Sequence, residues 1–168
     1  MRAGGRMRGR GFTLVEMLVT LTIVAILATA ILPFTRLTAT REKETQLRTA
    51  LREIRTAIDA YKAAADAGDI AVAAGDSGYP PSLEALADGV EAVRRPGAPA
   101  DAPAKRLYFL RRVPRDPFWL DAATPPAQTW RLRSYESPPG APAPGKDVFD
   151  VLSASDASAI DGTPYASW

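Results

Sequence analysis

The residues Gly11-Phe12-Thr13-Leu14-Val15-Glu16 separate an arginine-rich start from a long apolar run. The start carries four arginines and no acidic residue, and no charged residue occurs from Met17 to Thr35. A helix of that length extends about 28 Å, close to the thickness of the apolar core of a bilayer. The sequence therefore predicts a membrane-spanning helix over residues 12–35, with the arginines on its cytoplasmic side.

The position of the glycine distinguishes this start from an ordinary secretory signal. A secretory signal is cut after its apolar segment, whereas Gly11 precedes the apolar segment in this chain. This arrangement, with GFTLVE at the junction, resembles the class III leader of type IV pilins and of type II secretion pseudopilins. The resemblance implies that a prepilin peptidase cuts between Gly11 and Phe12 and that the new Phe12 amine is methylated. The leader is residues 1–11, or the five residues MRGRG if translation starts at Met7.

Glu16 is an acidic residue just inside the apolar segment. A carboxylate in a membrane helix costs free energy unless it reaches water or a cationic partner. It can extend to the lipid headgroups, or it can pair with a cation once the chain leaves the lipid for a packed assembly. The resemblance implies the second arrangement, in which Glu16 pairs with the Phe12 amine of a neighbouring subunit and sets the register of assembly.

Composition and charge exclude several classes of function. The chain has 21 Lys and Arg against 19 Asp and Glu, and loss of the four leader arginines leaves 17 against 19. Nucleic-acid binding needs a clustered positive surface, so we expect no nucleic-acid partner. The absence of histidine and cysteine excludes Ser-His-Asp and Cys-His nucleophiles, an ordinary zinc site and disulfides. No pair of carboxylates stands out for acid–base chemistry, so we do not expect an enzyme.

Apolar residues recur at helical spacing after the membrane segment. Their spacings alternate between four and three residues, which is typical of one face of an amphipathic helix. We expect one helix from about Phe12 to Ala65, kinked at Pro33, with the stop signal Ala67-Gly68-Asp69 after it. The apolar stripe, which we expect in the core, consists of Leu47, Leu51, Ile54, Ile58, Tyr61 and Ala65.

The rest of the chain predicts short elements joined by proline-rich loops. Ser82 can cap a short helix that has Leu83 and Leu86 on its inner face. Residues 107–110 predict a buried strand or helical turn, and residues 130–135 and 148–152 predict strands. The segments Pro96–Pro103 and Pro138–Gly145 are loops by composition.

Two further features concern turns and the end of the sequence. Asp116 lies between Pro114 and Pro117, where we expect it to accept hydrogen bonds from the backbone amides of a turn. Residues 165–168 either return along the sheet or place the Trp168 indole against the helix.

The loop after the last predicted strand is dense in oxygen-bearing side chains. Calcium takes six to eight oxygen ligands from carboxylates, hydroxyls and carbonyls. The loop resembles the calcium-binding C-terminal loop of the major pseudopilins, which implies Ser153, Asp156 and Asp161 as ligands. It departs from that pattern because Ala154 and Ala157 stand where glycines are usual, and a polar hairpin loop without an ion is the alternative.

The leader, the segments 79–86 and 107–119, and the last residues together resemble a type II secretion pseudopilin, most closely the major, G-type subunit. The absence of cysteine supports this choice over type IV pilins, many of which close their C-terminal region with a disulfide. The resemblance implies an α+β, pilin-like fold, in which a long N-terminal helix packs on a small antiparallel sheet of about three strands. The expected parts are a leader (1–11), a transmembrane helix half (12–35) and a periplasmic globular domain (36–168).

The resemblance also implies the partners and the place of work. Subunits wait in the bacterial inner membrane, surrounded by lipid, and polymerise into a helical pseudopilus that drives protein export. The implied partners are further copies of the chain, minor pseudopilins, the prepilin peptidase, and an inner-membrane assembly platform with its cytoplasmic ATPase. Two alternatives remain: a type IV pilin or minor pilin for adhesion, motility or DNA uptake, and a membrane-tethered periplasmic enzyme or binding module.

Overall fold

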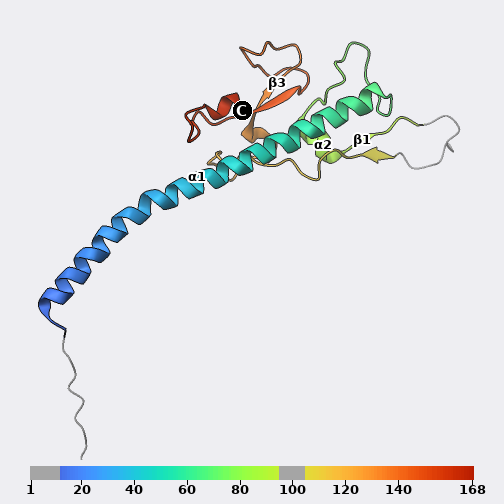
Figure 1. The fold of residues 1–168 in the computed structure, drawn as a ribbon. Helices are drawn as coiled ribbons and strands as arrows, with labels where there is room; N and C mark the ends of the chain where they lie inside the picture. The colour runs from blue at the N-terminus through green and yellow to red at the C-terminus, as the bar shows by residue number, and fades with distance from the viewer. Residues whose placement is uncertain (1–11, 95–104) are drawn as a thin grey trace, which may run out of the picture. The chain divides into compact units, whose positions relative to one another are not determined.

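The principal element of the chain is one long helix. The computed structural model describes residues 12–94 and 105–168, and of residues 30–36 only the backbone. Helix α1, Leu14–Asp66, belongs to both compact units into which the chain divides, Met1–Thr40 and Arg41–Trp168 (Figure 1). It is continuous through Pro33, so this proline does not end the helix. The predicted leader and the predicted loop Pro96–Pro103 lie outside the described residues.

The C-terminal half of α1 forms one wall of the core in the unit Arg41–Trp168. Its apolar stripe is buried there from Leu47 to Tyr61, which confirms the prediction from helical spacing, and Ala65 is partly buried. Leu47 and Ile54 are fully buried. The stripe packs against side chains that come from most of the remaining chain. Those that are themselves buried include Ile70, Leu83, Leu86, Leu110, Trp130, Val148, Val151 and Tyr165.

The end of α1 is closed by backbone hydrogen bonds that use a glycine. The Asp69 N–H donates to the Ala64 carbonyl at 2.9 Å, and the Gly68 N–H donates to the Ala65 carbonyl at 3.0 Å. This pattern requires a left-handed residue after the helix, and Gly68 supplies it with φ of 75°. The predicted stop signal is thereby confirmed, with the last helical residue at Asp66.

A short helix, α2, spans Leu83–Asp88 and follows the long helix. The Ser82 hydroxyl accepts a hydrogen bond from the Ala85 N–H at 3.4 Å, so Ser82 is the cap that the sequence predicted. Leu83 and Leu86 are buried beneath it. In Figure 1, α2 lies beside the C-terminal half of α1, consistent with the shared apolar core.

Two antiparallel sheets complete the described part of the fold. Strand β1 (Val90–Glu91) pairs with β2 (Arg106–Leu107), and β3 (Trp130–Arg133) pairs with β4 (Asp150–Ser153). In the second pair Trp130 lies opposite Ser153 and Arg133 opposite Asp150. A short 3₁₀ helix, η1 (Pro126–Thr129), precedes β3. A second one, η2 (Tyr165–Ser167), follows β4 near the last residue.

The α+β class is confirmed, and the strands are arranged as two sheets of two strands each. The strand predicted near Leu107 stops early because the next backbone groups bind elsewhere. The N–H groups of Phe109 and Leu110 both donate to the Leu86 carbonyl, at 3.0 and 2.9 Å. These bonds fix the chain to the end of α2, so β2 cannot extend along β1.

Asp116 organises the turn before β3 and connects it to β4. Its carboxylate accepts a hydrogen bond from the Phe118 N–H at 2.8 Å, which confirms the predicted backbone role. The other carboxylate oxygen accepts the Ser153 hydroxyl at 2.6 Å, and the Thr129 hydroxyl accepts from the Asp116 N–H at 3.1 Å. Asp116 is 1 % exposed, so its buried charge depends on these partners.

The buried stripe of α1 predicts a large effect of truncation. Ile54→Ala should reduce the free energy of unfolding by about 2–5 kcal/mol, because it removes a fully buried side chain and leaves a cavity. The neighbouring Glu53→Ala variant, at an exposed position, should change it by less than about 0.5 kcal/mol. Urea unfolding of both variants, followed by circular dichroism, measures the difference. Equal losses of unfolding free energy in the two variants would contradict the burial of Ile54 in the core.

Candidate functional site

The start of α1 is set by a threonine immediately after Phe12. The Thr13 hydroxyl accepts a hydrogen bond from the Glu16 N–H at 3.2 Å, and the Thr13 carbonyl accepts from the Met17 N–H at 3.2 Å. Thr13 is thus the N-cap, and Leu14 is the first helical residue. Glu16 lies in the first turn, where the positive end of the helix dipole favours a carboxylate.

The helix therefore begins two residues later than the predicted start at Phe12. The sequence contains the signal for this boundary, because Thr13 and Glu16 have the spacing of a capping box. The cap leaves Phe12 outside the regular helix and 76 % exposed. Like the N–H groups at the start of any helix, the Phe12 N–H has no acceptor within the helix.

The predicted site residues at this end are placed close together along the chain. Phe12 and Glu16 are both exposed, and Gly11 lies outside the described residues, so the bond Gly11–Phe12 is not part of the described geometry. Among residues 12–94 and 105–168, no hydrogen bond or ion pair involves the Glu16 carboxylate. The Glu16 carboxylate is thus unpaired within the described residues.

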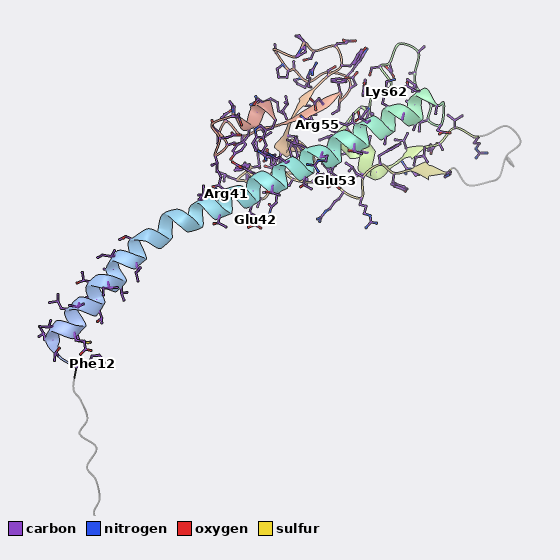
Figure 2. The ribbon with its side chains drawn as sticks, viewed as in Figure 1. Phe12, Arg41, Glu42, Glu53, Arg55 and Lys62 are labelled. Carbon is purple, nitrogen blue, oxygen red and sulfur yellow. The ribbon has the colours of Figure 1, made fainter. Side chains whose placement is uncertain are left out.

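Apolar side chains are exposed all around the helix that follows. Figure 2 shows side chains projecting on both sides of the α1 ribbon after Phe12. Between half and four-fifths of each large apolar side chain is exposed, and successive residues of this set cover all helical faces. The set is Leu14, Val15, Met17, Leu18, Val19, Leu21, Ile23, Val24, Ile26 and Leu27. This first part of α1 has no packing partner within the described chain.

The predicted membrane-spanning helix can be compared with the length and hydropathy of the helices in the structure. Among the described residues, none of the helices combines the length and the hydropathy of a membrane span. The segment predicted to span, residues 12–35, includes residues whose side chains are outside the description, from Ala30 to Thr35.

The three predicted calcium ligands have three different partners. The buried Ser153 hydroxyl donates to Asp116 at 2.6 Å, and Asp156, whose side chain is 95 % exposed, lies 3.5 Å from an Arg131 nitrogen. Asp161 accepts from the N–H and hydroxyl of Thr163, which lowers its pKa.

The Ser153 side chain is fully buried, and its hydroxyl hydrogen is donated to Asp116. In the described residues no group of three or more His, Cys, Asp or Glu side chains is placed to hold a metal ion. Calcium binding through Ser153, Asp156 and Asp161 stays a prediction.

The segment from Ile160 to Tyr165 is held directly on α1. Glu44 of α1 is buried and accepts hydrogen bonds from the Ile160 N–H at 2.8 Å and the Tyr165 hydroxyl at 3.1 Å. Burial, followed by the bond and charge of Glu44, raises the pKa of Tyr165 to about 12. Sequence reasoning missed Glu44; its position three residues before Leu47, on the inner face of the helix, was the available signal.

Two arginines of α1 hold the final tryptophan. The Arg48 guanidinium lies 4.3 Å from the centre of a Trp168 ring, and Arg55 donates to the Trp168 carbonyl at 2.7 Å. Arg55 also pairs with Asp150 of β4 at 2.8 Å. Of the two arrangements expected for the last residues, the structure has the indole against the helix.

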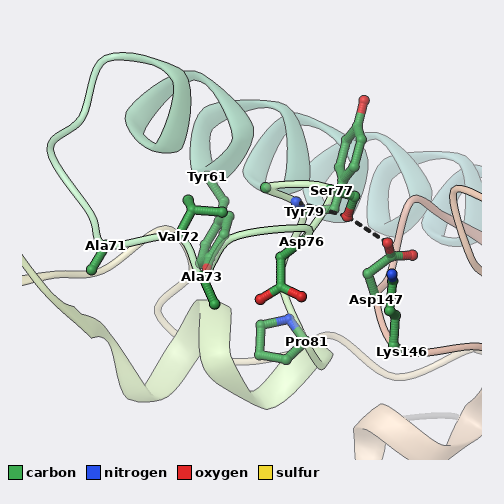
Figure 3. A pocket seen from close by; sticks show the side chains of 11 residues that line it. Tyr61, Ala71, Val72, Ala73, Asp76, Ser77, Tyr79, Pro81, Lys146 and Asp147 are labelled. Atoms are coloured by element: carbon green, nitrogen blue, oxygen red, sulfur yellow. Dashed lines mark hydrogen bonds between the residues drawn. The ribbon is translucent and has the colours of Figure 1, made fainter.

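A pocket of about 290 Å³ lies between the end of α1 and the loop after it (Figure 3). Asp147, on its wall, is buried and accepts the Ser77 hydroxyl at 2.5 Å, the Ser134 hydroxyl at 2.8 Å and the Tyr135 N–H at 2.8 Å. Burial alone raises the pKa of Asp147, but these hydrogen bonds and the charge of Lys146 outweigh burial, and the net pKa is lowered. The hydrogen bonds of Asp147 join the loop after α1 to the segments around Ser134 and Tyr135.

Comparison with known protein families gives one match. Residues 6–32 match the prokaryotic N-terminal methylation motif. Comparisons with curated proteins and with solved structures gave no significant match. The matched residues include Gly11, Phe12 and Glu16, and a motif of this kind implies processing by a prepilin peptidase and assembly of the pilus type.

Asp147 should make stability depend on pH. A carboxyl whose pKa is lowered on folding stabilises the fold above its ordinary pKa of 3.8, and this contribution is lost as the pH falls through the folded value. Asp147→Asn should therefore lower the free energy of unfolding by about 1–3 kcal/mol at pH 7. The loss should become progressively smaller below pH 3.8. Thermal melts across this range test the prediction, with Glu136→Gln, at an exposed ion pair, as the control.

The calcium prediction has a direct test. If Ser153, Asp156 and Asp161 bind the ion, excess CaCl₂ should raise the melting temperature of the full chain relative to excess EDTA. Asp161→Asn should remove that difference, whereas Asp121→Asn, an exposed acid in another loop, should keep it. Identical melts in CaCl₂ and EDTA would mean that no stabilising calcium site exists.

Proposed function

We propose that this chain, which carries the leader of a type IV pilin-like protein, is a structural subunit of a type II secretion pseudopilus. The match to the methylation motif supports the coarser statement of a membrane-anchored, pilin-type protein. The assignment to a secretion pseudopilus rests on the sequence resemblance and on the absence of cysteine. The major subunit is the form that the resemblance favours.

The observation that carries this proposal is the exposure of apolar side chains on all faces of the first part of α1. A helix that is apolar all round is stable in water only when something covers it. Lipid covers it before assembly in the proposed function, and the same helices of neighbouring subunits cover it in the filament. Each subunit exchanges one apolar environment for another, so the transfer itself need not expose the helix to water.

The proposed register signal is the pair formed by Glu16 and the Phe12 amine of a neighbouring subunit. The helix begins after its cap Thr13. Cleavage after Gly11 would therefore leave the Phe12 amine, a cation, on a short extension that precedes the helix. In a helix bundle of low dielectric, an unpaired carboxylate is costly and a paired one is much less so. Subunits in the correct axial register satisfy both charges.

The proposed mechanism is mechanical and places no chemistry on this chain. A cytoplasmic ATPase and an inner-membrane platform draw subunits from the membrane, and growth of the filament moves proteins toward export. The globular unit Arg41–Trp168 lies in the periplasm in this proposal, where minor pseudopilins and exported proteins meet it. Filaments used for adhesion, motility or DNA uptake would employ the same subunit chemistry, and the genes adjacent to this one distinguish the two machines.

Substitution of Glu16 separates processing from assembly. The Glu16→Ala variant should still be cleaved and methylated, because the peptidase acts at Gly11 and Phe12. The yield of filaments sheared from the cells should be lower by at least about tenfold. Mass spectrometry of the membrane-extracted chain reports the N-methylated phenylalanine, and electron microscopy reports the filaments. Glu42→Ala, an exposed acid on the same helix, is the matched control. Normal filaments from Glu16→Ala would contradict the pairing, and a chain that begins beyond residue 35 would contradict the proposed function.

A further inference from the structure

Two arginines one helical turn apart form an exposed cationic edge on α1. Arg48 and Arg52 line a groove of about 470 Å³ that is completed by Leu51, Thr56 and Trp168. Arg48 is held in place by its contact with the Trp168 ring. Within residues 12–94 and 105–168, Arg52 has no hydrogen bond or ion pair. The groove therefore offers one positioned cation and one unpaired cation, which we call the Arg48–Arg52 edge.

The other charged groups around this groove identify where an anion would bind. Arg55 is already occupied by Asp150 and by the carbonyls of Val151 and Trp168. The charge of Arg48 is partly shared, since, after the hydrogen bonds of Thr163, Arg48 also lowers the pKa of Asp161. Asp59 lines the groove toward the other end. An incoming carboxylate is thus attracted most strongly at Arg52 and repelled near Asp59.

A matching pair of acids lies on α2. Glu84 and Asp88 are also four residues apart and exposed, while Leu83 and Leu86 anchor α2 to the core from its other face. In the described ranges neither carboxylate has a hydrogen bond or ion pair. Like charges at this spacing repel each other on a helix, so each pair is relieved when opposite charges approach it.

We propose that the Arg48–Arg52 edge of one copy binds the Glu84–Asp88 face of α2 in a second copy of this chain. Both pairs have the one-turn spacing of a helix, which separates the attached Cβ atoms by about 5–6 Å. Two guanidinium groups can therefore face two carboxylates at the same time. The spacing and the charge of the two surfaces match without any change in the fold.

The two surfaces are different parts of the chain, so the contact is head-to-tail. A copy that binds through its Arg48–Arg52 edge keeps its own Glu84–Asp88 face free for a third copy. Such heterologous contacts propagate into an open helical array unless the rotation closes a ring. This inference rests on the proposed function and adds the surfaces through which the globular units recognise one another.

The contact is tested by cross-linking in the full chain, which contains no cysteine. Two copies with different tags, one carrying Arg52→Cys and the other Asp88→Cys, are expressed together in the native host and oxidised. The mixed-tag dimer should form at least about tenfold more than with the control pair Glu136→Cys and Lys146→Cys. Filaments without an excess of the mixed-tag dimer would overturn the contact and leave the proposed function intact.

Charge reversal provides the second arm. Arg52→Glu and Asp88→Arg should each lower the yield of sheared filaments about tenfold, because like charges then meet. The chain with both substitutions should return to within about twofold of the parent, since opposite charges meet again. Arg112→Glu, at an exposed position outside both surfaces, is the control and should retain the parental yield. Single variants with a normal filament yield would overturn this pairing, and so would a double variant whose yield does not recover. A parent chain that forms no filaments would instead overturn the proposed function.

Discussion

Among the described residues, the apolar first part of α1 has no packing partner, and this is the main physical constraint on the chain. Side chains from Leu14 to Leu27 are exposed on all faces of the helix. Burial of such side chains contributes about 25 cal/mol per Å² of apolar area, so a helix of this kind is strongly driven toward lipid or toward copies of itself. The methylation motif at residues 6–32 occupies the same segment, which connects this physical requirement with a pilin-type leader.

The second part of α1 meets the same requirement within the chain. From Leu47 to Tyr61 its apolar stripe is covered by α2, by β3 and β4, and by the loops between them. The two parts of this helix thus pack differently. The first part needs partners from outside the described residues, and the second part forms one wall of the core of a small domain. The change from apolar residues on every face to a single apolar stripe marks the transition between the two.

The helices could be predicted from the sequence because their signals are local. The spacing of Leu47 to Tyr61, the Ser82 cap and Gly68 each act within a few residues, and all three are found in the structure. The pairing of β1 with β2 could not be predicted, because each has only two residues and a long loop separates them. The partners of Ser153 were also beyond reach, since its hydroxyl binds Asp116, 37 residues earlier in the chain. Glu44 was missed for the same reason, because it binds the Ile160 N–H more than 100 residues later in the sequence. Calcium binding in this oxygen-rich loop stays a prediction.

The attachment of the final segment to α1 has a mechanical consequence. Glu44, Arg48 and Arg55 fasten Ile160, Tyr165 and Trp168 to the same helix that leads into the domain. A pull along this helix would reach the last residues through these contacts and strand β4 through the bonds of Arg55 to Asp150 and Val151. Both paths run beside the hydrogen bonds between β3 and β4, so those bonds would not carry the whole force.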